Sequence, residues 1–314
     1  MSHFERALEL AERGRGKTGD HPLVGAVVVR EREVVGEGWY EYDAVRHAEV
    51  IALEQAADRA RGATLYVTLE PCSHHGRTPP CADAVVAAGV ARAVVGARDP
   101  NPVVDGRGLE RLRAAGIEVE LLDDIAARRQ NEAWRAWKSL GRPFVTYKAA
   151  ITLDGRVAVP GRRWVSGEES RRRVHNLRAA SDAVAVGMGT VRADAPRLDA
   201  RDVDADRQPR RLAFGRGPLP EGSELELRMG SLEEELHALA ADGVQSLLLE
   251  GGPTLAAAFL AAGLVDKLLF FVAPVLAGDG PRVLGDLAAP LELLHLSAEP
   301  SGEDVLVQAY LREP

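Results

Sequence analysis

Short β-rich runs alternate with helical runs along this 314-residue chain, and this alternation limits most strongly how the chain can fold. In the first half the pattern predicts helices at 4–13, 47–57, 81–88 and 108–115. It predicts strands at 25–29, 34–38, 64–69, 92–97 and 117–121, the first two joined by the polar turn 30–33. Strands alternating with helices indicate α/β layers around a largely parallel sheet.

A second alternation follows a boundary in the middle of the chain. The stretch 123–140 is strongly helical in composition and ends at Gly141-Arg142-Pro143, where glycine and proline stop a helix. Beyond it we expect strands at 144–151, 183–186, 245–249 and 267–273, and helices near 169–179, 232–241 and 254–262. The chain is about twice as long as a typical single domain. We therefore expect two domains, residues 1–142 and 143–314.

The composition argues against several classes of protein. A net charge of −8 is unlike that of a dedicated nucleic-acid binder, which normally carries a basic face. The N-terminus lacks the apolar core of a signal peptide, and no apolar run reaches the roughly 18 residues that span a bilayer. We therefore expect a soluble cytoplasmic protein with a small-molecule partner and no nucleic-acid or membrane partner.

His47, Cys72 and Cys81 are candidate ligands of a metal ion. The chain has two cysteines, and in a reducing cytoplasm a structural disulfide is disfavoured, which leaves metal ligation, catalysis or chance. Both cysteines lie at predicted element ends, beside helix N-termini whose partial positive charge favours thiolates. One imidazole and two thiolates leave the fourth tetrahedral position to water, as in a catalytic Zn²⁺ site.

Glu49 lies two residues beyond the histidine and completes a chemical pattern. Zinc lowers the pKa of its water ligand, which provides a nucleophile near neutral pH. Glu49, which does not bind the metal, can take the proton and pass it to departing ammonia. His-x-Glu followed by Pro-Cys and a second Cys matches the zinc deaminase signature. The sequence therefore predicts a zinc-dependent deaminase in the N-terminal half.

The stretch from Leu69 to Cys81, Leu-Glu-Pro-Cys-Ser-His-His-Gly-Arg-Thr-Pro-Pro-Cys, resembles the deaminase half of the bifunctional deaminase–reductase family of riboflavin biosynthesis. Further similar segments are Val24-Gly25-Ala26, Asp99-Pro100-Asn101-Pro102 and Gly106-Arg107-Gly108. The general signature has two residues between the cysteines, whereas this chain has eight, 73–80. The resemblance implies that this loop, with His74, His75 and Arg77, helps to hold a phosphoribosylated pyrimidine.

The second half is similar to the reductase half of the same family. The resemblance lies in Lys148-Ala149-Ala150, Leu153-Asp154-Gly155, Gly189-Thr190-Val191 and Glu250-Gly251-Gly252-Pro253-Thr254-Leu255, among other segments. The Gly-Gly turn follows a predicted buried strand and leaves backbone N–H groups free for a phosphate. It is not a Rossmann fingerprint, since no G-x-G-x-x-G precedes the helix.

This resemblance implies a fold, cofactors and contacts. It implies a cytidine-deaminase-like three-layer N-terminal domain that binds Zn²⁺ and a dihydrofolate-reductase-like C-terminal domain that uses NADPH. The implied NADPH contacts are Ala150, Trp164, Thr190, Asp194, Gly252, Pro253, Thr254, Leu255, Ala256, Ala257 and Ala258. The implied substrate contacts are Arg178, Leu198, Arg201 and Glu250.

The resemblance also implies a reaction sequence. The first step is hydrolytic deamination of 2,5-diamino-6-(5-phosphoribosylamino)pyrimidin-4(3H)-one, and the second is NADPH-dependent reduction of the ribosyl group to ribityl. The hydride comes from the nicotinamide, while the protein supplies position and charge. Because the first product is the substrate of the second site, the two activities fit a homodimer or higher homo-oligomer.

Several positions depart from the family and keep other hypotheses open. His21 stands where an Asn is common, Tyr40 where a His is common and Gly215 where an Asp is common, and the loop 160–163 before Trp164 is short. One alternative is a deaminase of another purine- or pyrimidine-like heterocycle with a degenerate or merely nucleotide-binding second domain. Another is a zinc-stabilised scaffold, although such a protein has no need of Glu49. A nucleic-acid editing deaminase shares the zinc motif, but the acidic charge argues against it.

Overall fold

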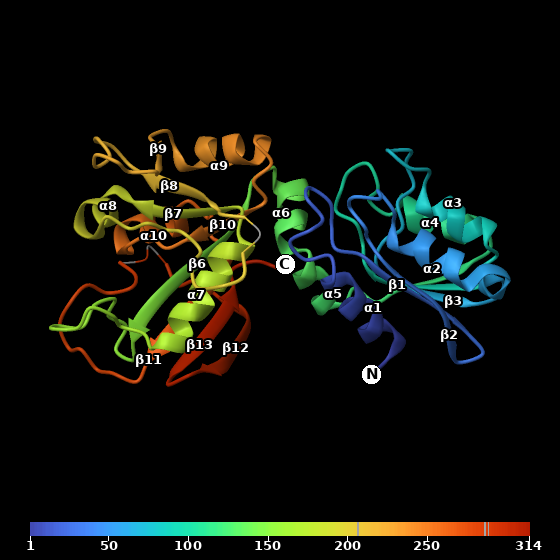
Figure 1. The fold of residues 1–314 in the computed structure, drawn as a ribbon, viewed down its shortest axis with the longest axis horizontal. Coiled ribbons are helices and arrows are strands. Elements are labelled where there is room, and N and C mark those ends of the chain that lie inside the picture. Colours follow the sequence, from blue (N-terminus) through green and yellow to red (C-terminus); the bar gives the residue numbers. More distant parts are fainter. Residues whose placement is uncertain (206, 286, 288) are drawn as a thin grey trace. The chain divides into compact units, whose positions relative to one another are not determined.

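The computed structural model describes residues 1–205, 207–285, 287 and 289–314, which form two compact units (Figure 1). Unit 1 contains Met1–Leu140 together with Pro314, and unit 2 contains Gly141–Glu313. Among the helices of these described residues, none combines the length and the apolar character needed to cross a membrane.

Unit 1 is built on a five-stranded sheet with the order β2-β1-β3-β4-β5. Its strands are β1 Gly25–Arg30, β2 Glu33–Trp39, β3 Thr64–Leu69, β4 Arg92–Ala97 and β5 Glu118–Leu121. Its helices are α1 His3–Glu12, α2 Ala48–Ala56, α3 Cys81–Ala87, α4 Arg107–Ala114, α5 Ile125–Gln130 and α6 Glu132–Leu140, with the short 3-10 helix η1 Ala57–Ala60. β1 is antiparallel to β2 and β3, whereas β3, β4 and β5 are parallel. The expectation of a largely parallel sheet is therefore wrong for this unit, because the β1–β2 hairpin adds antiparallel strands.

Alternation along β1 divides the apolar core of unit 1 into two layers. Ala26 and Val28 pack in a cluster that includes buried residues of α2, α3 and α4, whereas Val27 and Val29 pack with Ala7 and Leu10 of α1. Successive side chains of a strand point to opposite faces, so one strand serves both layers. The result is a sheet between two helical layers.

Gly36 shows how closely α2 lies on the sheet. A Cβ atom at Gly36 would lie 2.0 Å from the carbonyl oxygen of Ala52 in α2. Only glycine leaves room for this approach. The same helix begins directly after His47, so its close seating on β2 fixes the position of that imidazole.

The predicted helical stretch 123–140 is interrupted at Asn131, which separates α5 from α6. The Asn131 side chain accepts a hydrogen bond from the Leu23 N–H and donates one to the Leu23 carbonyl oxygen, both at 2.8 Å. This pairing with a distant backbone segment competes with helix continuation. The interruption could not be read from local composition, because its partner lies 108 residues away.

Unit 2 contains an eight-stranded sheet with the order β12-β13-β11-β6-β10-β7-β8-β9. The strands are β6 Phe144–Thr152, β7 Ala183–Gly187, β8 Arg210–Phe214, β9 Glu226–Arg228, β10 Ser246–Leu249, β11 Lys267–Ala273, β12 Leu294–Ser301 and β13 Asp304–Tyr310. The helices are α7 Glu168–Ala180, α8 Met188–Asp194, α9 Leu232–Ala241 and α10 Pro253–Ala261. The strands from β11 to β9 pair in parallel, and β12 and β13 add an antiparallel edge.

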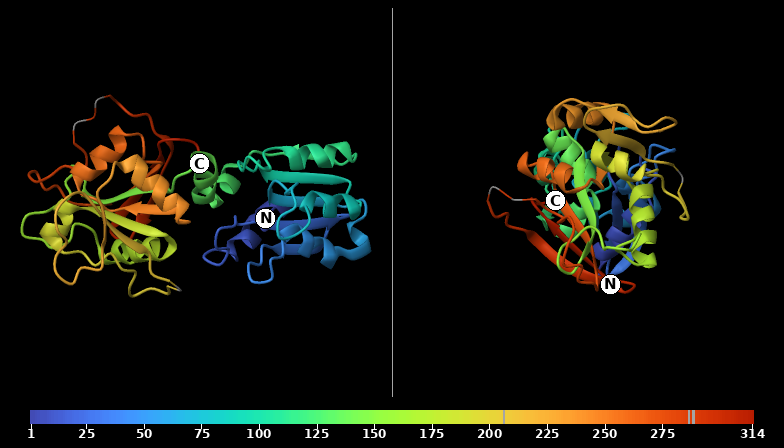
Figure 2. Two further views of the ribbon diagram at one scale, coloured as in Figure 1. Left: turned by 90° about the horizontal axis from the view of Figure 1, so that it is seen from above. Right: turned by 90° about the vertical axis from the view of Figure 1, so that its left-hand side faces the viewer.

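The helices of unit 2 cover both faces of this sheet. Buried residues of α9 and α10 pack on one face, in a cluster with alternate residues of β6. Residues of α7 and α8 pack on the opposite face (Figures 1 and 2). Because alternate residues of β6 are used for the core, its remaining side chains, including Lys148 and Ala150, face the α7 side.

Asp266 ties the beginning and the end of unit 2 together. Its carboxylate is fully buried and accepts two hydrogen bonds from Arg142, at 2.7 and 2.8 Å. It also accepts the Val145 N–H at 2.8 Å and pairs with Arg312 at 2.8 Å. One buried anion therefore holds the entry of β6 and the segment after β13.

We expect Asp266→Asn to lower the free energy of unfolding of unit 2 by about 3 kcal/mol, because it leaves the buried Arg142 without its counter-charge. Urea unfolding of the full chain, followed by probes in each unit, measures this change. Glu299→Gln is the matched control, since Glu299 forms an exposed pair with Arg173 that should contribute less than about 1 kcal/mol. Equal effects of the two substitutions would contradict this role of Asp266.

Candidate active sites

His47, Cys72 and Cys81 come together in unit 1 although they are far apart in sequence. His47 is the N-cap of α2, Cys72 follows β3, and Cys81 is the first residue of α3. His47 Nδ1 lies 3.0 Å from Cys81 Sγ and 3.8 Å from Cys72 Sγ, and the three ligand atoms all lie within 4.8 Å of one another. Ligands at the bond lengths of tetrahedral zinc are separated by roughly 3.5–4 Å. The donor set and its spacing therefore fit one Zn²⁺.

The electrostatics of this cluster favour a thiolate at Cys72. Hydrogen bonds from Cys81 and His47 lower the pKa of Cys72, and the Cys81 N–H at the start of α3 donates to Cys72 Sγ at 3.2 Å. The hydrogen bond to Cys72 and burial raise the pKa of Cys81. The pair thus shares one proton, which a bound metal would displace.

Glu49 is buried beside the ligands. It lies in the first turn of α2 and is 3% exposed. Burial raises the pKa of Glu49 to about 7, although the charge of His47 opposes this shift. A carboxyl group that changes protonation state near neutral pH is suited to general acid–base catalysis.

The loop 73–80 and two aromatic residues surround the same histidine. Thr78 Oγ1 lies 3.3 Å from His47 Nε2, so the loop contacts the imidazole nitrogen that faces away from the cysteines. His75 and Arg77 are exposed, and His74 is half-buried. The Tyr40 ring packs edge-on against His47, with centroids 5.5 Å apart, and His21 lies beside Tyr40. The departures at positions 21 and 40 therefore lie at the metal site.

Glu70 is a residue of this site that the sequence analysis did not single out. It is 3% exposed and follows β3, two residues before Cys72. Its carboxylate accepts backbone N–H groups of Asp99, Gly106, Gly108 and Leu109, at 2.8–3.3 Å. A Cβ atom at Gly108 would lie 2.0 Å from the Pro71 carbonyl oxygen, so α4 begins directly against the backbone before Cys72. Glu70 joins this part of the backbone to the Asp99–Pro102 turn and to α4.

We expect Glu70→Gln to lower kcat/KM for deamination by about tenfold to a hundredfold. The amide NH₂ cannot accept hydrogen bonds from the backbone N–H groups that it would face, and the backbone beside Cys72 would therefore shift. Zinc content, measured by metal analysis, should stay near one per chain. The activity of unit 2 provides an internal control, since Glu70 lies in unit 1. Unchanged deamination would show that these four hydrogen bonds do not position the site.

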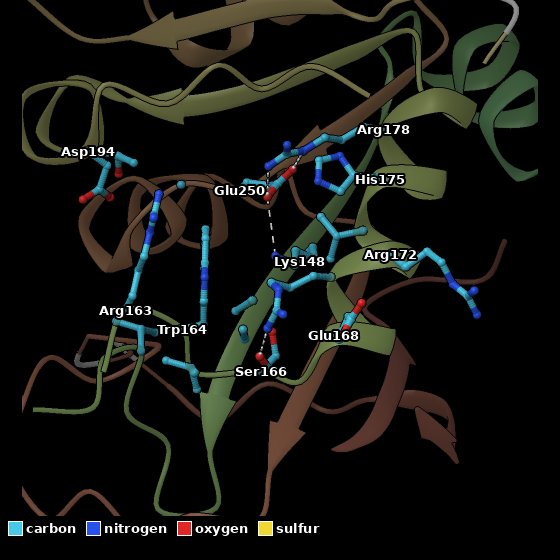
Figure 3. Close-up of a pocket in the computed structure, with 18 of the residues that line it drawn as sticks. Lys148, Arg163, Trp164, Ser166, Glu168, Arg172, His175, Arg178, Asp194 and Glu250 are labelled. Carbon is cyan, nitrogen blue, oxygen red and sulfur yellow. Dashed lines mark hydrogen bonds and ion pairs between the residues drawn. The ribbon is translucent and has the colours of Figure 1, made fainter. Parts of the chain in front are cut away.

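Unit 2 contains a cavity of about 1060 Å³ on the α7 side of the sheet (Figure 3). Its wall is formed by β6, by α7, by the loop before α7, by α8 and by the turn after β10. Six of the predicted contact residues with side chains larger than alanine line this cavity: Trp164, Arg178, Thr190, Asp194, Arg201 and Glu250. Ala150 and Gly252 also line it.

Glu250 lines this cavity and joins two cations. Arg178 donates to it at 2.6 and 3.0 Å, and Lys148 Nζ lies 3.4 Å away (Figure 3). Although burial raises it, the neighbouring Lys148 and Arg178 charges hold the pKa of Glu250 at about 2. Glu250 is therefore a permanent anion that orients both cations, and Lys148 is a cavity residue whose role the sequence analysis did not assign.

A second group of polar residues combines His175 of α7 with Asp199 and Arg201, which follow α8. Arg201 pairs with Asp199 at 2.6 Å, and the His175 ring contacts the Asp199 carbonyl oxygen at 3.3 Å. Burial and the nearby charges of Arg178 and Arg201 lower the pKa of His175, so this imidazole is neutral near pH 7. These residues give the cavity hydrogen-bond donors beside Glu250.

Other predicted contacts lie beside the cavity rather than on its wall. The Leu198 side chain is 2% exposed and packs in a core cluster, so only its backbone is available to a ligand. Pro253 to Ala258 belong to the first turns of α10, whose N-cap Gly252 makes no side-chain capping bond. The first backbone N–H groups of a helix have no partner within the helix and suit a phosphate group.

Asp304 holds the helix that carries much of this wall. Its buried carboxylate accepts the Gly167 N–H at 2.8 Å, at the N-cap of α7, and the Ser170 hydroxyl at 2.5 Å. Arg171, His175 and Arg178 lie on one face of α7, spaced by four and three residues. Asp304 therefore fixes the helix whose side chains enter the cavity, a role that no local sequence pattern indicates.

The chain is similar to known proteins over nearly its whole length. The model of the RibD C-terminal domain matches residues 143–307, and that of the cytidine and deoxycytidylate deaminase zinc-binding region matches residues 1–97. The riboflavin biosynthesis protein RibD of Aquifex aeolicus is 37% identical, with 98% of this chain and 97% of the relative covered. That of Escherichia coli is 40% identical, with 90% and 89% covered.

Solved structures agree with this similarity. RibD of Acinetobacter baumannii superposes with a TM-score of 0.84 at 35% identity, covering 98% of this chain and 97% of that one. A Thermotoga maritima structure, described as a diaminohydroxyphosphoribosylaminopyrimidine deaminase/5-amino-6-(5-phosphoribosylamino)uracil reductase, gives 0.83 at 34% identity, covering 98% and 97%. These matches confirm the cytidine-deaminase-like and dihydrofolate-reductase-like domains expected from the sequence. The chain belongs to the RibD family, the bifunctional deaminase–reductases of riboflavin biosynthesis.

Proposed function

We propose that this chain deaminates 2,5-diamino-6-(5-phosphoribosylamino)pyrimidin-4(3H)-one at unit 1 and then reduces the ribosyl group of the product to ribityl at unit 2. The observation that carries the proposal is the metal-ligand cluster with Glu49 beside it, in a chain whose other unit holds a separate cavity. The deaminase domain would be residues 1–142 and the reductase domain residues 143–314.

In the deaminase site, His47, Cys72 and Cys81 would hold Zn²⁺, and Glu49 would be the catalytic residue. When bound, zinc lowers the pKa of a coordinated water to near neutrality. Glu49 takes a proton from the nucleophile and delivers it to the leaving amino group as ammonia departs. The buried position of Glu49 supports this role, because the carboxyl group is shielded from solvent protons.

In the reductase site, Ala150, Trp164, Thr190, Asp194 and the segment Gly252 to Ala258 would contact NADPH, while Arg178, Leu198, Arg201 and Glu250 would contact the substrate. When bound, NADPH supplies a hydride equivalent to C1′ of the sugar. Opening of the ribosyl ring leaves its oxygen in need of a proton. Lys148, which Glu250 holds at the cavity wall, is placed to donate it.

We also propose a homodimer, with β12 at the interface. Seven of its eight residues are exposed, and Leu294 and Leu296 of this edge strand and Val305 of β13 present apolar surface. Edge strands with exposed apolar side chains are usually covered in an assembly. Light scattering of the purified chain measures its mass directly.

The partners and the location follow from the same sites. We propose a phosphoribosyl pyrimidine as partner and no nucleic acid, since the net charge is −8. A cytoplasmic location is proposed because the two cysteines must stay reduced to bind a metal.

The proposed activity is tested by incubating the zinc-loaded chain with the diaminopyrimidinone ribosyl phosphate, with and without NADPH. We expect ammonia release in both samples and NADPH oxidation in the second. Ammonia without NADPH oxidation would refute the reductase assignment, and neither signal would refute the substrate assignment.

A further inference from the structure

Trp164 lies in the cavity wall with two arginines packed on its ring. The side chain is 51% exposed, and it belongs to the loop between β6 and α7. The Arg163 Cζ atom lies 5.0 Å from the ring centroid, and the Arg171 Cζ atom lies 5.5 Å from it. Figure 3 shows Arg163 and Trp164 side by side at the cavity. All three residues line the cavity.

These two arginines differ from the other cations of the cavity in their charge balance. Lys148 and Arg178 share Glu250, Arg201 pairs with Asp199, and Arg172 pairs with Glu169. Within the described residues, neither Arg163 nor Arg171 forms an ion pair with a carboxylate, although Glu168, Asp194 and Asp202 also line the cavity. The arginines of the cavity wall that have no carboxylate partner among the described residues therefore lie around Trp164.

Stacking on an aromatic ring suits a guanidinium to anion binding. A cation–π contact uses none of the N–H donors at the edge of the guanidinium, so these donors stay available to an anion. Arg171 uses Nη1 to donate to the Ser166 carbonyl oxygen at 2.7 Å, which anchors its side chain. Two such groups match the several oxygens of a phosphate, which arginine binds through paired N–H donors.

We propose that Arg163 and Arg171, held against Trp164, form a binding site for a phosphate monoester in the reductase cavity. This proposal rests on the proposed function of unit 2, whose two ligands each carry such a group. NADPH has the 2′-phosphate that distinguishes it from NADH, and the substrate has the 5-phosphate of its ribosyl group.

The site is tested by titration calorimetry on the full-length chain, with probes that differ only in the phosphate. Adenosine 2′,5′-bisphosphate is compared with adenosine 5′-monophosphate for the cofactor, and ribose 5-phosphate with ribose for the substrate. We expect Arg163→Gln together with Arg171→Gln to weaken binding of one phosphorylated probe at least tenfold, and the probe lacking the phosphate less than twofold. Arg163→Lys combined with Arg171→Gln should weaken binding less than the double glutamine variant does, because lysine keeps the positive charge.

Arg162→Gln is the matched control, since it removes the same charge from the adjacent position, which does not line the cavity. It should change every affinity less than twofold. A loss confined to the adenosine bisphosphate would assign the site to the cofactor, and a loss confined to ribose 5-phosphate would assign it to the substrate; either result supports the proposal.

Two results would overturn the site and are distinguishable from each other. If the unaltered chain binds the probes and the double variant binds them equally well, only the arginine site is wrong. If the unaltered chain binds neither phosphorylated probe, the ligands proposed for unit 2 are wrong as well. Unchanged ammonia release by unit 1 in the double variant shows that the rest of the chain is folded.

Discussion

Replacement of Glu49 by glutamine should lower kcat for ammonia release by about 10²- to 10⁴-fold, the usual contribution of a positioned general acid–base group. Glutamine fills the same buried volume beside His47, but it cannot accept the proton or deliver it to the leaving amine. Zinc content should be unchanged, because Glu49 is not one of the three ligand residues. Single-turnover ammonia assays together with metal analysis of the same sample measure both quantities.

Glu54→Gln is a suitable control for this variant. Glu54 lies on the same helix, α2, but its side chain is exposed and pairs with Arg46. It should change kcat less than twofold. If Glu49→Gln retained more than about a tenth of the activity with its zinc in place, another group would have to move the proton.

Loss of the metal should have the second large effect, and this effect should be confined to one activity. We expect Cys81→Ser, or treatment with a zinc chelator, to reduce ammonia release to background, since the water then keeps its ordinary pKa. Reduction of the deaminated substrate should continue at the normal rate, because the cavity of unit 2 contains none of the three ligands. Separate assays of ammonia and NADPH on one preparation measure this difference.

Added Zn²⁺ provides the control for chelation. It should restore ammonia release to the chelated chain but not to Cys81→Ser. Unit 1 should also unfold at a lower temperature without the metal, because a ligand that binds only the folded state stabilises it. Parallel loss of both activities would contradict two independent sites.

Much of the fold was predictable because its elements have strong local patterns. The strands at 64–69, 92–97 and 267–273 and the helix at 232–241 are confirmed with the same bounds, since each has a buried run or an apolar stripe with clear ends. β12 was not predicted, because seven of its eight residues are exposed and no alternation of burial marks it. Three further elements were not predicted: α8, which is only seven residues long, and β8 and β9, which lie in a segment with weak periodicity.

The predicted metal ligands were recognisable because zinc requires particular residue types, and the structure brings all three together. Glu70, Lys148 and Asp304 were not identified, because their roles depend on partners 29 to 137 residues away in the sequence. A buried carboxylate that accepts backbone N–H groups has no diagnostic motif. Its only sequence signal is a charged residue within an otherwise apolar strand end, as in Leu69-Glu70-Pro71.

The ribosyl phosphate is present in both proposed reactions. The substrate keeps its ribosyl phosphate through deamination, so the product arrives at unit 2 with the same anionic group. If calorimetry assigns the arginines around Trp164 to the substrate, unit 2 gains binding energy from a group that does not react.

The most direct test of the central claim, that the chain performs two consecutive reactions at separate sites, is NADPH oxidation by the Glu49→Gln variant supplied with either pyrimidine. With the deaminated pyrimidine the variant should oxidise NADPH at the rate of the unaltered chain. With the diaminopyrimidinone it should oxidise NADPH only as fast as the residual deamination allows. Equal rates with both compounds would show that reduction does not depend on prior deamination, and would contradict the proposed order of the two reactions.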